Sequence, residues 1–288
     1  MECTLCPRRC RAERTATDGR GFCQSPATPH IARAALHFGE EPCISGTRGS
    51  GTVFFTGCTL RCAYCQNKQI SRTVCGRAVT PQDLADIFRD LYSQGAHNLN
   101  LVNPTHYVPA ILEALALYRP PIPIVYNTGG YERVETLRLL DGYVDVYLPD
   151  LKYLSPDLSR ALSGAENYAE YAVPAILEMA RQTGPVLLDE QGIAQKGTIV
   201  RHLALPGHTK ETMAVLDLLS QRLPQGTLVS LMFQYTPMGE IKGFPELSRT
   251  LTRRECDKLS DYLCTLDLDG YVQQKDSTGV QHIPKFEV

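Results

Sequence analysis

Residues 52–65 read Thr-Val-Phe-Phe-Thr-Gly-Cys-Thr-Leu-Arg-Cys-Ala-Tyr-Cys, an apolar run that leads directly into three closely spaced cysteines, Cys58, Cys62 and Cys65. The short spacings let three thiolates converge from one loop on one inorganic cluster. Four cysteines would saturate a cubane iron–sulfur cluster, whereas three leave one iron open, much as a catalytic zinc keeps an open position. The stretch therefore predicts a metal cluster with an exchangeable site, which suits chemistry better than electron storage.

Short apolar runs alternate with amphipathic stretches from Gly51 onward. We expect strands at 52–56, 98–102, 122–126, 144–148, 198–203 and 228–232. Helical periodicity falls near 81–94, 107–118, 132–140, 167–182 and 209–222, and a final helix near 252–265 precedes a short strand near 270–274. Six such βα repeats predict an α/β protein with a parallel sheet, either open or curled into a partial (β/α)6 barrel.

Polar side chains follow the ends of these apolar runs. Beyond Cys58, they are Asn103, Asn127, Thr128, Asp150, Lys152, Arg201 and Gln234. In parallel α/β folds the ligand site is assembled at the carboxyl ends of the strands. We therefore expect these side chains to meet at one rim and to bind a ligand there.

The composition is that of a soluble globular enzyme, with 43% apolar residues, 21% charged residues and a net charge of -2. This balance argues against a general nucleic-acid or membrane binder. The longest apolar runs, 121–126 and 143–149, fall far short of a membrane span. Charged residues begin at Glu2, which is not typical of a signal peptide. We expect a cytoplasmic protein.

Eleven cysteines are unusual for such a protein, and in a reducing compartment they indicate metal binding or catalysis rather than disulfides. Four are scattered, and we interpret them as buried structural thiols: Cys43, Cys75, Cys256 and Cys264. Four others form an N-terminal group with two, three and twelve intervening residues: Cys3, Cys6, Cys10 and Cys23.

These four N-terminal cysteines would complete a closed tetrahedral site. Zinc and an auxiliary iron–sulfur cluster are both allowed, and we favour zinc because a second cluster is not needed for the chemistry. Nearby arginines would offset the charge of a thiolate site. Residues 1–45 have little periodicity, so we expect a Cys-rich, loop-rich metal-binding extension there and a core domain at 46–288.

The CxxxCxxC spacing with an aromatic residue before its last cysteine resembles the signature of radical S-adenosylmethionine (SAM) enzymes. Within that superfamily, Tyr64-Cys65-Gln66-Asn67, Asn127-Thr128-Gly129, Asp150-Leu151-Lys152 and Arg201-His202 are similar to motifs of pyruvate formate-lyase activating enzymes. The whole chain looks like an uncharacterised subgroup related to those enzymes. The resemblance implies a [4Fe–4S] cluster whose open iron chelates SAM. A reductant such as flavodoxin or ferredoxin would supply the electron that cleaves SAM to a 5′-deoxyadenosyl radical, which abstracts a hydrogen atom.

The resemblance also implies roles for the strand-end residues. Lys152 and Arg201 would hold the SAM carboxylate, and Asp150 would pair with Lys152 or reach the amino group. Asn127 and Thr128 would contact the ribose or methionine end, Tyr64 the adenine side and Gln234 the far side of the rim. Many activases carry an acidic Gly-Gly-Glu-like segment after the second strand, where this chain reads Leu-Val-Asn-Pro-Thr-His at 101–106. Asn103 or Thr105 would substitute there.

Three functions are open at this point. The favoured one is an activase that installs a glycyl radical on a partner protein or otherwise modifies it. The second is a radical SAM enzyme that acts on a small molecule or RNA. The third is a non-enzymatic metal-binding or electron-transfer protein, which the open iron position disfavours because a carrier would use four ligands.

Overall fold

The computed structural model describes residues 2–273 and 286. A central run of parallel strands follows the order β10-β9-β8-β6-β5-β4-β2. Their bounds are β2 Ser50–Phe55, β4 Leu99–Val102, β5 Ile124–Thr128, β6 Val146–Pro149, β8 Ala194–Leu203, β9 Leu228–Met232 and β10 Gly270–Gln273. Among the described residues, β10 and the opposite edge are not paired with each other, so the sheet is open. The predicted α/β fold with a partial barrel is confirmed.

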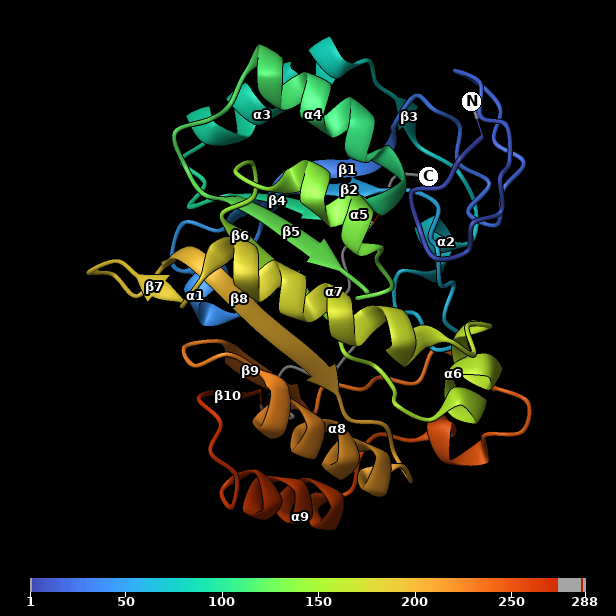
Figure 1. Ribbon diagram of the computed structural model, residues 1–288, viewed down its shortest axis with the longest axis vertical. Coiled ribbons are helices and arrows are strands. Elements are labelled where there is room, and N and C mark those ends of the chain that lie inside the picture. The colour runs from blue at the N-terminus through green and yellow to red at the C-terminus, as the bar shows by residue number, and fades with distance from the viewer. Residues whose placement is uncertain (1, 274–285, 287–288) are drawn as a thin grey trace.

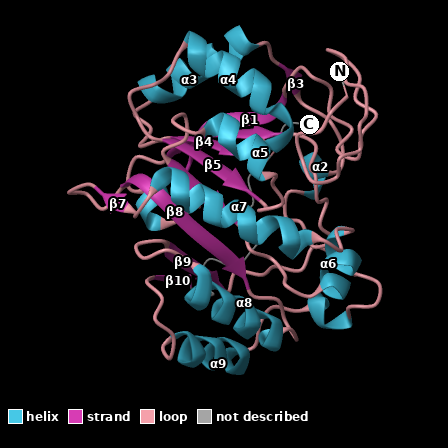
Figure 2. Ribbon diagram, in the orientation of Figure 1, coloured by secondary structure: helices cyan, strands magenta, loops and turns pink. Residues whose placement is uncertain are grey.

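The helices connect successive strands and cover one face of the sheet, which lies behind them in Figure 2. Their bounds are α3 Pro81–Ser93, α4 Val108–Leu117, α5 Val134–Leu137, α6 Pro156–Ser163, α7 Tyr168–Thr183, α8 Thr209–Arg222 and α9 Arg253–Leu263. Short helices α1 (Pro42–Ser45) and α2 (Lys68–Ser71) flank β2. Turns of 3-10 helix lie at Thr105–Tyr107, Arg138–Leu140 and Pro245–Ser248. None of the helices within the described part of the chain is long and apolar enough to cross a membrane.

Local sequence explains where α3 begins and which face it buries. Thr80 caps the helix by accepting a hydrogen bond from the backbone of Asp83, whose side chain accepts one from the Thr80 backbone. This reciprocal capping box satisfies two donors that the first turn leaves open. Leu84, Phe88 and Leu91 recur at helical spacing and are buried against the sheet.

One edge of the sheet was not expected from the sequence. Strand β1 (His30–His37) pairs antiparallel with β2, and β3 (Arg77–Ala78) pairs with β1. The sequence analysis treated 30–37 as part of a loop-rich extension, but β1 is half-buried and takes its pairing from a strand that follows it. The short strand β7 (Leu187–Leu188) and helix α6 were also missed. The division of the chain at residue 45 stays a prediction.

Candidate functional site

The cysteine triad (Cys58, Cys62 and Cys65) lies in the loop that leaves β2 at its carboxyl end. Gly57 opens this loop at a φ of 78°, and a Cβ there would collide with Ser25 of the N-terminal segment. The Leu60 backbone N–H donates to Cys58 Sγ at 3.3 Å, and the Cys65 N–H donates to the Cys62 carbonyl at 3.2 Å. The glycine and these bonds shape the loop, and all three cysteines line one cavity.

A cavity of about 860 Å³ opens beside the triad. In Figure 1 the arrows of β5 and β8 point toward the side of the molecule where α2 and α6 lie, and the cavity is reached from these strand ends. The structure brings all of the sequence-predicted rim residues to its wall: Tyr64, Asn103, Asn127, Thr128, Asp150, Lys152, Arg201 and Gln234. Their placement at one site agrees with the strand-end argument, while their individual roles stay predictions.

Asp150 connects the two cations of the site. Lys152 Nζ lies 2.6 Å from one carboxylate oxygen of Asp150, and Arg201 Nε lies 2.9 Å from the other. Burial alone would raise the pKa of Asp150, but Arg201 and Lys152 hold that pKa below its usual value. Asp150 in turn raises the pKa of Lys152 against the effect of burial. The three groups therefore stay charged in a water-poor wall.

Two glutamates of the site were missed by the sequence analysis. Glu40 Oε2 lies 3.0 Å from Arg201 Nη1, and Asn127 Nδ2 donates to Glu40 Oε1 at 3.0 Å. Glu41 accepts from Gln273 at 3.1 Å, and its other oxygen is buried without a hydrogen-bond partner among the described residues. Burial raises the pKa of both carboxyls, while Arg201 opposes the shift. The segment 37–42 forms one wall of the cavity, its floor. The only local sequence signal for this segment was the acidic pair Glu40-Glu41 before Pro42.

Asn103 and Thr128 also have partners within the protein. Asn103 adopts a φ of 57°, its side chain donates to the Gly57 carbonyl, and its N–H donates to the Asn127 carbonyl at 2.8 Å. Thr128 Oγ1 donates to Glu132 at 2.5 Å, as does Thr105 Oγ1. Burial raises the pKa of Glu132 to about 7. Thr105, expected as a substitute acceptor for the ligand, is thus turned toward this buried carboxyl.

The N-terminal cysteines are not assembled as a ready metal site. Cys6 and Cys23 are buried, Cys3 is half-buried and Cys10 is exposed. In residues 2–273 and 286, no three His, Cys, Asp or Glu side chains are grouped closely enough to hold a single metal ion, and this applies to the cysteine triad as well as to the N-terminal cysteines. Burial raises the pKa of Cys6 to about 12, and Cys23 and Cys3 add to this rise. The closed four-cysteine site stays a prediction.

The N-terminal segment is held against the triad loop. Arg8 Nε donates to the Thr59 carbonyl at 2.9 Å, and Arg8 Nη2 donates to the Ser163 carbonyl at 2.8 Å. The Arg8 guanidinium also lies 3.9 Å from the centre of the Phe22 ring, a favourable cation–π geometry. Arg14 Nη1 donates to the His106 carbonyl at 2.6 Å. The extension therefore packs directly on the loop that carries the triad.

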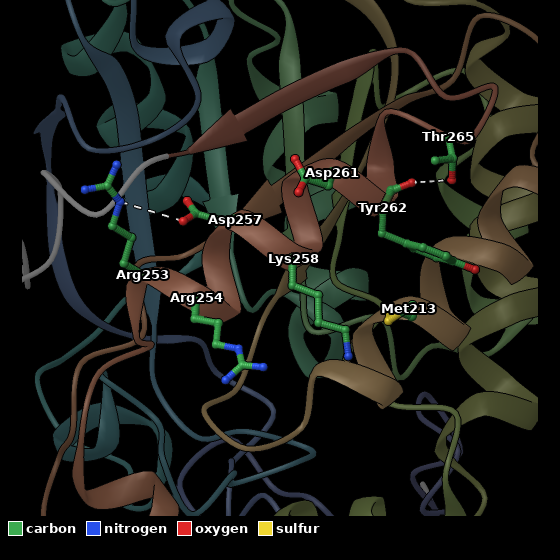
Figure 3. A pocket seen from close by; sticks show the side chains of 8 residues that line it. All are labelled: Met213, Arg253, Arg254, Asp257, Lys258, Asp261, Tyr262 and Thr265. Carbon is green, nitrogen blue, oxygen red and sulfur yellow. Dashed lines mark hydrogen bonds and ion pairs between the residues drawn. The ribbon is translucent and has the colours of Figure 1, made fainter.

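A second hollow lies between α8 and α9, away from these residues. Its wall contains charged side chains of both signs, and Figure 3 shows Arg253 paired with Asp257 across 3.7 Å. It contains none of the predicted site residues. The cavity beside the triad is therefore the candidate active site.

The donor set of this cavity fits an iron–sulfur cluster and SAM. Three thiols from one loop leave one position open on a cubane cluster, and N–H and O–H donors at Cys58 and Cys62 suit thiolate sulfur. For SAM, Lys152 and Arg201 offer cations to a carboxylate, and Asp150 offers a carboxylate to an ammonium group. The unpartnered oxygen of Glu41 leaves further acceptor capacity at the floor.

An open parallel α/β sheet with three cysteines after its first parallel strand defines a class of iron–sulfur enzymes. The chain belongs to the radical SAM superfamily, whose family model matches residues 52–219. It accordingly uses a [4Fe–4S] cluster and SAM. Over 279 residues it is 31% identical to the uncharacterized protein MJ0674 of Methanocaldococcus jannaschii, covering 93% of this chain and 75% of that protein.

Solved structures share the fold at low sequence identity. SuiB of Streptococcus suis, solved with its precursor peptide SuiA, is 16% identical with a TM-score of 0.53 over 75% of this chain and 46% of SuiB. A radical SAM methyltransferase of Sphaerobacter thermophilus is 16% identical with a TM-score of 0.54 over 81% of this chain and 68% of that one. The chain thus spans about half the length of SuiB. These structures support the fold; a specific relation to pyruvate formate-lyase activating enzymes stays a proposal.

Proposed function

We propose that the cysteine triad binds the [4Fe–4S] cluster and that the strand-end residues bind SAM beside it. The observation that carries this proposal is that one short loop of three thiols and the charged group of Asp150, Lys152 and Arg201 line the same cavity. When bound, the cluster and SAM supply a 5′-deoxyadenosyl radical for hydrogen abstraction. A low-potential reductant such as flavodoxin or ferredoxin provides the electron.

The protein's own residues bind and orient the reactants. Lys152 and Arg201 attract the SAM carboxylate, and Asp150 keeps both cations in place by holding each with one oxygen. Asn127 and Thr128 contact the ribose or methionine end, Tyr64 the adenine side and Gln234 the far rim. These side chains are mostly buried, so they exclude water from the reacting region and strengthen the electrostatic contacts there.

The substrate proposal is an exposed segment of a protein, as for an activase-like enzyme that installs a glycyl radical. The motif similarity of the chain to activating enzymes supports it, as does SuiB, a fold neighbour solved with a peptide. The cavity volume of about 860 Å³ is in the upper part of the range for ligand sites, so SAM leaves room for a further group. The second candidate is a small molecule, favoured by the segment Gly39–Glu41, which adds the carboxyls of Glu40 and Glu41 to the cavity wall.

The test is anaerobic reconstitution with iron, sulfide, SAM and dithionite, followed by measurement of 5′-deoxyadenosine. Cys62→Ala is expected to lose the cluster and all SAM cleavage. Cys256→Ala, on the outer helix α9, is the matched control and should cleave SAM at the parental rate. A Cys62→Ala variant that still cleaves SAM at that rate would refute the assignment. Repeating the assay with candidate partner proteins, and looking for a glycyl radical signal by EPR, separates a protein substrate from a small molecule.

A further inference from the structure

A chain of hydroxyl groups runs from helix α6 to the middle cysteine of the triad. Ser163 Oγ donates to Cys62 Sγ at 3.0 Å, and the Tyr153 hydroxyl lies 3.0 Å from Ser163 Oγ. The Tyr64 hydroxyl, 2.7 Å beyond Tyr153, completes the chain. The Tyr153 hydroxyl donates its single proton to the Tyr64 oxygen, so Ser163 is the donor in both of its contacts, to Cys62 Sγ and to the Tyr153 oxygen. Ser163 and Cys62 are 3% and 6% exposed, which keeps water from competing for these bonds.

Ser163 is held in this position from its backbone side as well. It is the last residue of α6, which ends at Gly164 in the left-handed conformation, φ 58°. Arg8 donates to the carbonyls of Ser163 and Gly164, and its Nε donates to Thr59 within the triad loop. One guanidinium therefore joins the end of α6 to the loop, so the distance from Ser163 to Cys62 is fixed by contacts on both sides.

A hydrogen bond to a cluster thiolate affects reduction more than it affects binding. Reduction adds an electron to the cluster and increases the negative charge on its sulfur ligands. A donor to such a sulfur stabilises the reduced form more than the oxidised form, and hydrogen bonds to sulfur are among the features that set cluster potentials. This stabilisation of the reduced form is larger when the hydrogen bond lies in a buried region of low dielectric constant.

We propose that Ser163 is a positioning residue that raises the reduction potential of the cluster through its hydrogen bond to Cys62. The inference rests on the proposed placement of the cluster on the cysteine triad. Arg8 and Tyr153 act through Ser163, because Arg8 fixes its backbone and the Tyr153 oxygen competes with Cys62 Sγ for its proton. The N-terminal extension thereby acts on the electron-accepting step from outside the cavity.

The experiment is a redox titration of the reconstituted, cluster-loaded protein, followed by EPR of the reduced cluster. Ser163→Ala is expected to keep its iron and to show a more negative midpoint. At the parent's midpoint potential its reduced-to-oxidised ratio should fall about three- to tenfold, which for one electron is about 30–60 mV. Tyr153→Phe removes the acceptor that competes for the Ser163 proton, so it should shift the midpoint by less and in the opposite direction. Ser163→Thr, which retains a hydroxyl, should restore the parental value.

Ser159→Ala is the matched control. Ser159 is buried in the same helix, and its hydroxyl donates to the carbonyls of Pro156 and Glu166 rather than to the triad. It should leave the midpoint unchanged. An unchanged midpoint in iron-loaded Ser163→Ala overturns this inference and leaves the triad assignment intact. A full cluster in Cys62→Ala overturns the proposed function itself. If Ser163→Ala fails to bind iron, the Tyr153→Phe midpoint decides the question.

Discussion

Arg201 is the residue whose removal should disturb the candidate site most. Its guanidinium donates to Asp150 at 2.9 Å, to Glu40 at 3.0 Å and to Asn127 at 2.7 Å, and the side chain is 12% exposed. Arg201→Ala leaves the buried carboxylates of Glu40 and Asp150 with Lys152 as the cation nearest to Asp150. Breaking a buried ion pair from one side costs about 3–5 kcal/mol. Burial already raises the pKa of Glu40, so in the variant this carboxyl takes up a proton and becomes neutral. We therefore expect a cost at the lower end of this range, about 3 kcal/mol.

A loss of about 3 kcal/mol lowers the melting temperature of a chain of this size by roughly 6–12 °C. SAM affinity should fall about tenfold or more, as expected for a lost charge-assisted hydrogen bond of about 1.5–3 kcal/mol. The assays are a thermal melt and a SAM-binding titration of the cluster-loaded protein, with iron content measured in parallel. Arg160→Ala is the control, because Arg160 also pairs with two carboxylates, Asp157 and Glu166, but all three side chains are exposed at the surface beside α6. It should change neither quantity appreciably. An Arg201→Ala protein with parental melting temperature and SAM affinity would contradict the reasoning.

Three further predictions concern the metal sites, the buried acid and a glycine. A variant with all three triad cysteines changed to Ala should retain about one zinc per chain on the N-terminal cysteines, as measured by metal analysis. Residual iron with cluster absorbance would refute zinc. Absence of both metals would refute the site. Glu132 has a pKa of about 7 in the fold against 4.5 as the ordinary value, so the unfolded chain loses its proton first and stability falls as pH rises between these values. The free energy of unfolding of Glu132→Gln should therefore exceed that of the parent by about 3 kcal/mol at pH 8, and this gain should vanish near pH 4. An equal gain at both pH values in thermal melts would contradict the prediction. Gly130 has a φ of 79°, and a Cβ there would collide with the Asp150 carbonyl, so Gly130→Ala should cost about 1–3 kcal/mol of stability and weaken SAM binding; a parental melt and titration would rule this out.

The parts of the fold that the sequence predicted correctly depend on local order. The parallel strands are short apolar runs, and most rim residues lie in the last positions of a strand or a few positions beyond it, so strand-end geometry was enough to bring them together. Helix 132–140 was placed correctly, although it divides into α5 and a 3-10 turn. The activase subtype could not be decided in this way, since substrate choice depends on the shape of the cavity rather than on the cofactor motifs.

The parts that the sequence did not predict come from distant contacts. Glu40 reaches Asn127 and Arg201 across 87 and 161 positions, and Ser163 reaches Cys62 across 101. Strand β1 exists because a later strand pairs with it. No periodicity or spacing near these residues carries that information, because the partner that gives each its role lies on a different element. A parallel sheet places such distant segments side by side.

The contacts of the N-terminal segment have a consequence for the biosynthesis of the protein. Leu5 is held by Thr136, Arg8 by Ser163 and Arg14 by His106, across 131, 155 and 92 positions. None of these contacts can form until the later residue has left the ribosome, and long-range contacts close late in folding. The extension is therefore translated before the residues that hold it, and it docks only after they have been made. During that interval these contacts do not yet enclose the thiols of the extension, so the proposed N-terminal metal site would be accessible for loading before the extension docks.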